Sequence, residues 1–561
     1  MRACLARGGR TASAYGRNEK GSNLGMKNAT TLAAKARMHA RAAAATLAFG
    51  AIAGGLLSAA LRLPASAQGV DSAMLLHPPA DSWPEYQGDY SGMRHSPITQ
   101  ITPANVHNLT LAWAFQSGQP AGIKASPLLV NGVIYVSAMD HVWAVDARTG
   151  HAIWHYIYPP NKGGTIGQRG VAMYKDSIYY LSPDDHLVCL RASDGSVRWI
   201  VQVADSSVGY ITTVAPLIVK NHVIVGIAGD LDNIQGFLCS VNADTGKLEW
   251  RWNSTPPAGT PNSTTGGMTW IPGTYDPKLN LLYWGTGNPT PVLDGSVRPG
   301  PDLYTCSIVA LDPDTGKMVW AFQPMPHDTH DWDAVEIPVL VDGVFQGKPR
   351  KLLLQASRNG YFFVLDRTTG KVLLSAPFGP LNWSLGLNKD GQPIPNPEKD
   401  PAPDGRLVSP DEGGLTNFRS PSFDPKTGLF LVNASFSYGI FYHKPADGSY
   451  GWAGADYGLA ARGWLEAIDY HTGKIRWSHR MGYFRSPSAG ILTTASGLAF
   501  TGDATGNILA LDTATGKTLW HAGMGGNMLT SPTTYELDGR QYVLVGSGNM
   551  MFAWALPEAA R

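Results

Sequence analysis

The sequence has little charge and, after residue 67, no long apolar run. Only 16% of the 561 residues are charged, and 44 Lys and Arg nearly balance 43 Asp and Glu. No basic stripe or run of like charge follows residue 67, so neither nucleic acid nor an anionic membrane surface is an expected partner. No later segment is apolar over the length that a transmembrane helix needs. No G-x-G-x-x-G motif joins a strand to a helix, which argues against a nicotinamide enzyme.

Cysteine is also scarce. Cys4 lies in the N-terminal region, which leaves Cys189, Cys239 and Cys306 in the rest of the chain. Three cysteines without a C-x-x-C pair give no disulfide framework, so we expect free buried thiols. The absence of C-x-x-C-H excludes a c-type haem attached to this sequence.

Residues 1–67 read as a targeting segment. Basic residues precede the apolar run Ala42–Leu61, and an A-x-A cleavage sequence follows at residues 65–67. An internal start codon and an uncleaved anchor are the alternatives. We therefore expect residues 68–561 to be a soluble, periplasmic protein that is not stably inserted in the membrane after cleavage.

Glycine, proline and tryptophan are plentiful, with 64, 40 and 17 copies, as in an all-β protein with many turns. An eleven-residue phrase recurs in which a strand, a Thr-Gly or Asp-Gly turn and a second strand form a hairpin. The seven copies are Ala144–Trp154, Cys189–Trp199, Ser240–Trp250, Ala310–Trp320, Val364–Leu374, Ala467–Trp477 and Ala510–Trp520.

The spacing of these copies predicts the fold. Successive copies start 43 to 103 residues apart, and periods in the forties and fifties are typical of propeller blades. The longest gap has room for two units, and the degenerate hairpin Ser422–Val432 lies within it. We therefore expect one eight-bladed β-propeller from about Trp83 to Leu556, with no second globular domain. The final Trp of the phrase should wedge between neighbouring blades.

Four motifs occur in order along these repeats: QRGVA (Gln168–Ala172), WGTGNP (Trp284–Pro289), PHDTHDWDA (Pro326–Ala334) and SRNGYFFVLDRTTG (Ser357–Gly370). With the repeats, they resemble the PQQ-dependent (quinoprotein) alcohol dehydrogenases, of which methanol dehydrogenase is the best-known type. The resemblance covers nearly all of residues 68–561. It implies oxidation of an alcohol or sugar by pyrroloquinoline quinone (PQQ), with Ca²⁺ or a lanthanide ion and a separate electron acceptor such as cytochrome c.

The resemblance also assigns the catalytic and metal-binding residues. It makes Asp331 the general base and Asn288 an amide ligand of the metal. Asp333 lies two residues beyond Asp331, so both carboxylates could face one ion in extended backbone. A second Asp here occurs both in lanthanide-using methanol dehydrogenases and in membrane glucose dehydrogenases, and alone it does not identify the metal. The neighbouring His327, Asp328 and His330 are expected only to form a capped turn.

The planar, anionic quinone needs cations at its edge and flat surfaces on its faces. The resemblance places Trp270 under the ring and Arg358 at the quinone oxygens. The remaining candidates for contact with the cofactor are Lys124, Arg169, Thr213, Gly229 and Asn417.

Several positions depart from the family pattern. Leu231 stands where the family has a metal-binding Glu, so Asp232 or Asp230 would have to take that role. Lys124 replaces a Glu, and a cation there could pair with a cofactor carboxylate. Met268 replaces a Thr donor and Ser488 a Trp, while NKGGTIG (161–167) lacks the adjacent cysteines of methanol dehydrogenase.

These departures indicate a divergent branch and keep two alternatives open. The chain could be a non-catalytic propeller of the outer-membrane assembly type, or a protein that binds PQQ as a sensor without turnover. The first gives no reason for the four motifs to occur together in this order. The sensor alternative stays open because Leu231 cannot bind a metal ion as the family's Glu does.

Overall fold

The computed structural model describes residues 69–558, except for 120–121, 160–167, 230–233, 258–259, 261–263, 445–450, 482–488 and 504. The chain divides into residues 1–66 and 67–561, and all described residues belong to the second unit. The predicted targeting segment lies outside the described residues. No helix within the described ranges is long and apolar enough to span a membrane.

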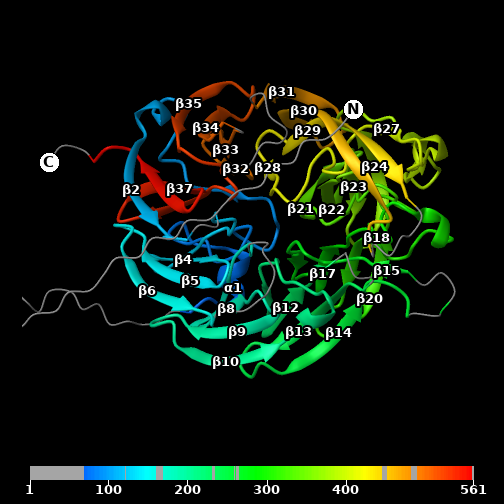
Figure 1. The fold of residues 1–561 in the computed structure, drawn as a ribbon. Coiled ribbons are helices and arrows are strands. Elements are labelled where there is room, and N and C mark those ends of the chain that lie inside the picture. Colours follow the sequence, from blue (N-terminus) through cyan, green and yellow to red (C-terminus); the bar gives the residue numbers. More distant parts are fainter. Residues whose placement is uncertain are drawn as a thin grey trace, which may run out of the picture. The chain divides into compact units, whose positions relative to one another are not determined.

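The described residues form an all-β propeller in which the larger sheets follow one another around a common centre (Figure 1). Eight sheets have four or five strands each. The first sheet is β3–β6 (Leu128–Val130, Val133–Ala138, His141–Asp146, Ala152–Ile157). The second is β7–β10 (Ala172–Tyr174, Ser177–Leu181, His186–Arg191, Val197–Gln202). The third is β11–β14 (Leu217–Val219, His222–Gly226, Phe237–Asn242, Leu248–Asn253). The fourth is β16, β17, β19 and β20 (Thr274–Asp276, Leu281–Gly285, Ile308–Leu311, Met318–Phe322).

The second half of the chain supplies the other four sheets. The fifth sheet is β21–β24 (Val339–Phe345, Lys348–Ala356, Tyr361–Asp366, Lys371–Pro377). The sixth is β27–β31 (Arg406–Val408, Ser422–Asp424, Leu429–His443, Gly454–Asp469, Ile475–Arg480). The seventh joins β1 (His95–Ser96) to β32–β35 (Leu492–Thr494, Leu498–Gly502, Asn507–Asp512, Thr518–Gly523). The eighth joins β2 (Thr110–Gln116) to β36–β38 (Thr533–Leu537, Arg540–Ser547, Met550–Ala555).

The remaining elements are short. Two small sheets pair β15 with β18 (Thr265–Gly266, Pro289–Thr290) and β25 with β26 (Ser384–Leu387, Pro393–Pro395). The α-helix is α1 (Ser72–Leu76), and four 3-10 helices cover Val106–Asn108, Ser206–Val208, Gly295–Val297 and Pro397–Lys399.

The recurring phrase forms the outer hairpin of seven sheets, as predicted. In the fourth copy, Gly316 has the left-handed φ of +69° that its tight turn requires. A Cβ at this position would lie 2.5 Å from Cε3 of Trp250, the final residue of the preceding copy. The Trp250 indole also donates a hydrogen bond to the Pro313 carbonyl, at 2.8 Å. The predicted wedge is therefore confirmed for this pair of neighbouring sheets.

The same contact recurs around the molecule. The indole N–H of a Trp within one outer strand donates to the carbonyl of the fourth residue of the next phrase. The other pairs are Trp113 with Ala147, Trp154 with Ala192, Trp320 with Arg367, and Trp477 with Thr513. Each indole buries apolar area and satisfies its polar group in one contact, which fixes the spacing of adjacent sheets.

The eighth sheet differs from the sequence prediction. The hairpin Ser422–Val432, expected to mark a separate unit, pairs β28 with β29 in the same sheet as the phrase Ala467–Trp477. That prediction is wrong. The eighth sheet instead pairs β2, near the N-terminal end of the described chain, with β38 near its C-terminal end.

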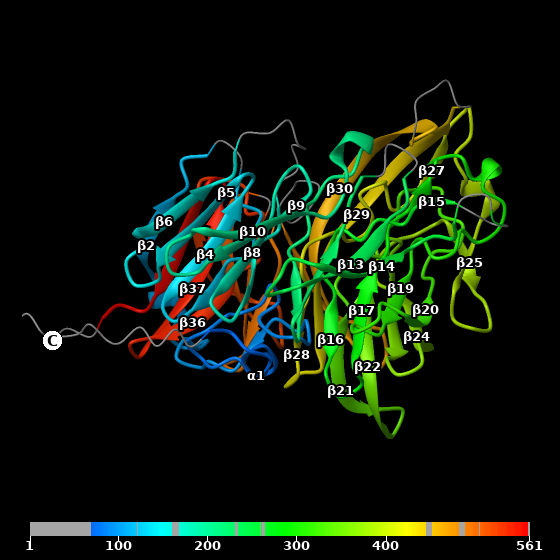
Figure 2. The same cartoon turned by 90° about the horizontal axis from the view of Figure 1, so that it is seen from below.

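The segment from Val70 to Ser96 runs across the lower side of the sheets in Figure 2, where α1 is labelled. Its backbone bonds to the first strands of several sheets: Trp83 exchanges hydrogen bonds with Leu129 of β3, and His95 pairs with Thr493 of β32. The buried Arg94 guanidinium donates to the carbonyls of Tyr86, Ile491 and Pro532. These bonds tie the segment to sheets that are far apart in the sequence.

Candidate active site

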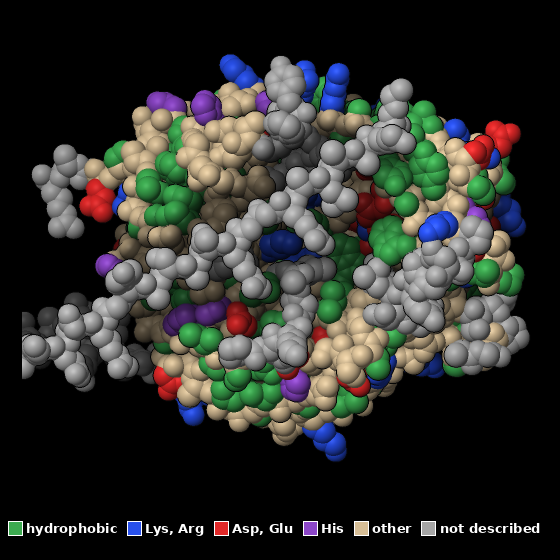
Figure 3. All heavy atoms as spheres, in the orientation of Figure 1, with side chains coloured by type: hydrophobic (Ala, Val, Ile, Leu, Met, Phe, Trp, Pro, Cys, Tyr) green, Lys and Arg blue, Asp and Glu red, His purple; other side chains and the backbone are tan. Residues whose placement is uncertain are grey.

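One part of the candidate site lies where the chain approaches several of the sheets. Five side chains lie three or four residues before the first strand of a sheet, and Arg419 lies three residues before β28; the five are Lys124, Arg169, Thr213, Trp270 and Glu336. Backbone hydrogen bonds link the segments that carry Lys124, Arg169 and Thr213. Ser126 N–H, two residues after Lys124, donates to the Arg169 carbonyl, and Arg169 N–H donates to the Thr213 carbonyl. In the view of Figure 3, Lys and Arg side chains lie in a central hollow, with Asp and Glu side chains to one side of it.

The loop Pro326–Ala334, between β20 and β21, holds Asp331. The buried Asp328 carboxylate accepts the backbone N–H groups of His330 and Trp332, at 3.3 and 3.1 Å, which is the expected capped turn. Trp332 is fully buried and anchors the loop. Asp331 itself has a φ of +65°, a left-handed conformation that Asp adopts more readily than most residues.

Arg358 brings the two aspartates of this loop together. It lies between β22 and β23 and donates to Oδ2 of Asp331 at 2.9 Å and to Oδ2 of Asp333 at 2.7 Å. It also donates to the Glu412 carbonyl at 2.8 Å, and Oε1 of Glu412 lies 3.3 Å away. The carboxylates of Asp331 and Asp333 therefore face one guanidinium, although the backbone at Asp331 is not extended.

Asp333 is hydrogen-bonded through both of its oxygens. Oδ2 also accepts the Trp270 indole N–H at 3.0 Å, and Oδ1 accepts the Asn288 backbone N–H at 2.6 Å. The Asn288 side chain donates to the Pro289 carbonyl at 3.1 Å. Asp333 thus positions Trp270, Asn288 and Arg358 relative to one another.

Burial dominates the electrostatics of this region. It raises the pKa of Asp331 well above its usual range; the Arg358 guanidinium opposes the shift and the Asp333 charge adds to it. Burial likewise raises the pKa of Asp333 and of Glu336. Oδ1 of Asp331 and both carboxyl oxygens of Glu336 are buried without a hydrogen-bond partner in the described part of the chain.

The other side of the site is cationic. Cζ of Arg169 lies 4.6 Å from the ring centroid of Trp270 and 5.3 Å from that of Phe418. Cζ of Arg419 lies 4.7 Å from the Phe418 centroid. Lys124 is close enough that both arginines lower its pKa, after the larger effect of burial. One end of the site is therefore rich in carboxylates and the other in cations.

The remaining predicted residues have identifiable local contacts. The Thr213 carbonyl accepts Nη1 of Arg169 at 3.1 Å. Asn417 Nδ2 donates to the Gly413 carbonyl at 3.0 Å. Gly229 has a φ of +126°, and a Cβ there would lie 2.3 Å from the Gly209 carbonyl oxygen, so the local backbone requires glycine.

Some predicted positions lie outside the described residues. They are Asp230 and Asp232, the substituted positions Leu231 and Ser488, and the segment 161–167. Within the described ranges, no three His, Cys, Asp or Glu side chains converge as a metal site would require. The described residues bring Asp331, Asp333 and Asn288 together but do not complete a ligand shell.

Both ends of the site still suit the groups that the sequence resemblance implies. The unpartnered oxygens of Asp331 and Glu336 and the excess of carboxylates over Arg358 favour a bound cation. The cations at the other end favour an anionic, flat molecule beside Trp270.

Four contributors were not anticipated from the sequence: Glu336, Glu412, Phe418 and Arg419. Two of them carried a usable signal. Glu336 interrupts the apolar run Ala334–Val341, and Arg419 precedes β28 at the same distance as Arg169 precedes β7. Glu412 and Phe418 lie in irregular backbone, where no periodicity marks them.

Cys189, Cys239 and Cys306 are buried and free, as expected. Met268 is also buried, and its carbonyl accepts the Gly287 N–H at 2.7 Å.

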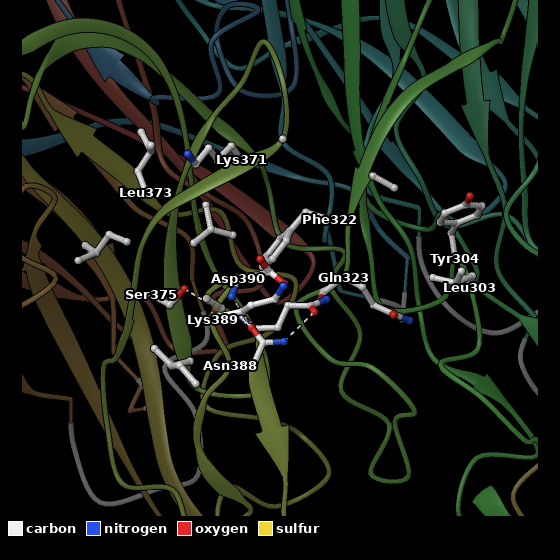
Figure 4. Close-up of a pocket in the computed structure, with 17 residues that line it drawn as sticks. Leu303, Tyr304, Phe322, Gln323, Lys371, Leu373, Ser375, Asn388, Lys389 and Asp390 are labelled. Carbon is white, nitrogen blue, oxygen red and sulfur yellow. Dashed lines mark hydrogen bonds between the residues drawn. The ribbon is translucent and has the colours of Figure 1, made fainter.

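A pocket of about 600 Å³ lies elsewhere, between β20, β24 and the β25–β26 hairpin (Figure 4). Phe322, Gln323, Leu373 and Asn388 are among its lining residues. None of the predicted site residues lines this pocket, so it is separate from the candidate active site.

Comparisons with known proteins identify the family of the chain. The PQQ family model described as "Glucose/ethanol/alcohol dehydrogenase, beta-propeller domain" matches residues 83–377 and 449–543. The quinohemoprotein alcohol dehydrogenase of Comamonas testosteroni is 35% identical over 517 residues, covering 83% of this chain and 72% of the relative. The lanthanide-dependent methanol dehydrogenase of Methylorubrum extorquens is 33% identical over 527 residues, covering 82% of this chain and 86% of the relative.

A solved structure of a quinohemoprotein alcohol dehydrogenase from Pseudomonas putida HK5 superposes with a TM-score of 0.83 at 29% identity. It covers 88% of this chain and 83% of that one. The sequence and the fold thus match the same family over most of the chain. The chain therefore belongs to the PQQ-dependent alcohol dehydrogenases, a family of oxidoreductases.

Proposed function

We propose that this chain oxidises the CH–OH group of a small alcohol or sugar to a carbonyl, with PQQ as the oxidant and Asp331 as the general base. The observation that carries the proposal is the setting of Asp331. Its carboxylate is buried, one oxygen is held by Arg358, and the other has no partner among the described residues. An oxygen held in place and unpaired can accept the proton of a substrate hydroxyl.

Bound PQQ would supply the two-electron acceptor, and a bound ion would supply Lewis-acid polarisation of oxygen atoms. The protein's part is to orient and to move a proton. Arg358 fixes Asp331 through Oδ2, which leaves Oδ1 for the hydroxyl proton. Trp270 offers a flat surface whose orientation Asp333 fixes through the indole N–H.

The ion would be Ca²⁺ or a lanthanide, bound by Asn288, Asp331 and either Asp230 or Asp232, with Asp333 in reach. Such a shell contains oxygen ligands alone, which disfavours zinc and copper. A relative at 33% identity is named lanthanide-dependent, which supports testing both ions.

Asp333→Ala separates two roles for this carboxylate. Selective loss of lanthanide-supported activity, with calcium-supported activity retained, would favour direct contact with a trivalent ion. Equal loss with both ions would instead favour its role as the acceptor that holds Trp270 and Arg358.

Electrons would leave the reduced cofactor for a separate carrier, most simply an exported cytochrome c. The sequence contains no C-x-x-C-H motif for attaching haem. The purified chain should therefore reduce added cytochrome c while showing no haem absorbance of its own. Stoichiometric haem on the purified chain would contradict this.

The same proposal includes two features of the whole chain. Each of the eight sheets would be one blade of an eight-bladed propeller, closed by β2 and β38. The N-terminal 67 residues would direct export to the periplasm, where a soluble carrier could meet the enzyme.

The proposed activity is tested by a screen of alcohols and sugars with an artificial dye acceptor. Apo-protein is reconstituted with PQQ and, in parallel, with Ca²⁺ or La³⁺. Dye reduction that requires PQQ, an ion and a CH–OH substrate is the expected result. Tight PQQ binding without dye reduction for any substrate would favour a sensor, and no PQQ binding would favour a non-catalytic propeller.

A further inference from the structure

Lys124, Arg169 and Arg419 form a cluster of three cations, which we call the cationic cluster, and the described residues give it no counter-charge. Each residue lies three or four positions before a strand of a different sheet, namely β3, β7 and β28. No carboxylate forms a salt bridge with any of the three within the described part of the chain. Three positive charges are thus brought together, and the described residues leave them unneutralised.

Both arginines of the cationic cluster have a buried Nε without a hydrogen-bond partner among the described residues. Arg169 has one carbonyl partner, Thr213. Burial lowers the pKa of both arginines to about 10, so both remain charged at neutral pH. Burying unpaired charges is costly, and a bound anion would offset that cost.

Aromatic rings hold the two guanidinium groups in place. Phe418 contacts both, with Cζ of Arg169 5.3 Å and Cζ of Arg419 4.7 Å from its ring centroid. Trp270 holds Arg169 from a second ring, at 4.6 Å. Cation–π contacts of this kind stabilise each arginine without using up its N–H donors, which stay available to a ligand.

The position of the cationic cluster identifies its ligand class. Arg169 contacts Trp270, which is hydrogen-bonded to Asp333 and through it to Arg358 and Asp331. A flat molecule beside Trp270, with its reactive end at Arg358, would therefore carry its anionic groups toward the cationic cluster. PQQ is planar and bears three carboxylates.

We propose that Arg419 is a cofactor-binding residue of this chain. It would join Lys124 and Arg169, which the sequence resemblance already assigns to cofactor contact, in one clamp for the carboxylates of PQQ. The proposal rests on the proposed function. Because Lys124 replaces the Glu usual in the family, the clamp carries three cations where that pattern would place an acid beside the arginines.

Binding of two ligands to apo-protein tests the clamp without any activity measurement. PQQ and its uncharged trimethyl ester are titrated separately, and binding is followed by quenching of tryptophan fluorescence. Arg419→Gln should weaken PQQ binding by on the order of tenfold to a hundredfold, as expected for one lost charge-assisted hydrogen bond. Binding of the ester should change little, because it lacks the carboxylate charge.

Two further variants serve as controls. Arg419→Lys keeps the charge and should retain most of the preference for PQQ over its ester. Arg462→Gln removes an exposed arginine from β30 and should leave both affinities unchanged. Circular dichroism of each variant verifies that it is folded.

The outcomes distinguish the clamp from the proposed function. If wild-type protein binds PQQ and Arg419→Gln weakens PQQ and ester equally, or neither, the clamp is contradicted and the proposed function stands. If wild-type protein binds neither ligand, the proposed function fails and the clamp fails with it.

Discussion

Acidic and basic side chains lie at opposite ends of the site. Asp331, Asp333 and Glu412 surround Arg358 at one end, while Lys124 and the two arginines lie at the other. The donors and acceptors are fixed by the fold before any ligand binds, which is the condition for effective electrostatic stabilisation.

Asp331→Asn tests the base directly. The amide keeps the shape and one oxygen for Arg358 but cannot accept the hydroxyl proton, so the rate of alcohol oxidation should fall by roughly two to four powers of ten. PQQ binding should persist, measured by fluorescence quenching on the same preparation. Oxidation at a near wild-type rate would remove Asp331 from the role of base.

The sequence could predict those site residues that stand in recognisable motifs. Asp331, Asn288 and Arg358 were predicted in this way, and the structure places them near one another through Asp333. Arg419 stands in none of these motifs. Its only sequence signal is its distance from β28, and its proximity to Lys124 and Arg169 arises from folding.

At the scale of elements, the outer hairpins were predictable because their pairing is local. The turn, the alternation and the final Trp all lie within eleven residues. The closing sheet was not predictable in this way, since β2 and β38 are separated by most of the chain. A degenerate local hairpin at Ser422–Val432 was therefore mistaken for the missing unit.

Gly316→Ala should disrupt one contact between sheets. The new Cβ would meet the Trp250 ring at 2.5 Å, in addition to the strain of a φ of +69°. Gly539→Ala is the matched control, because Gly539 has a φ of +75° and no atom within 4 Å of its Cβ position. Gly539→Ala should cost about 1–2 kcal/mol from backbone strain, and Gly316→Ala clearly more. Equal losses in thermal stability would show that the Trp contact is unimportant.

The segment that crosses the lower side of the sheets contains a buried acid, Glu85. Burial raises its pKa to about 8; Asp89 adds to the shift, and the Gln87 backbone N–H opposes it. The folded protein therefore holds a proton there that the unfolded chain releases near pH 4.5. Stability from this group is greatest below pH 4.5 and falls as the pH rises to about 8.

Glu85→Gln removes this titration. At pH 8 the free energy of unfolding of the variant should exceed that of wild type by on the order of a few kcal/mol, and its melting temperature should be higher. This difference should shrink toward pH 5. Glu558→Gln changes an exposed acid and should show no such trend. A margin for Glu85→Gln that is the same at both pH values would contradict the buried, protonated state.

In the described chain, the pairing of β2 with β38 joins segments from near its two ends. Truncation after Asn549 removes β38 and exposes the edges of both β2 and β37. We expect loss of soluble, cooperatively unfolding protein, because unpaired edges promote aggregation. Truncation after Leu556 keeps β38 and should leave the melting temperature nearly unchanged. A soluble and cooperative product from the shorter chain would show that closure is dispensable.

Oxidation of an alcohol by PQQ bound in this site can be followed in a single-turnover reaction of the reconstituted protein. The reaction contains excess alcohol and no electron acceptor, and the absorbance of bound quinone and the carbonyl product are measured together. We predict loss of the oxidised quinone absorbance and about one carbonyl formed per bound PQQ, with neither change in Asp331→Asn over the same time. Bound quinone that stays oxidised in the presence of every alcohol and sugar tested, with either ion, would contradict the proposed function.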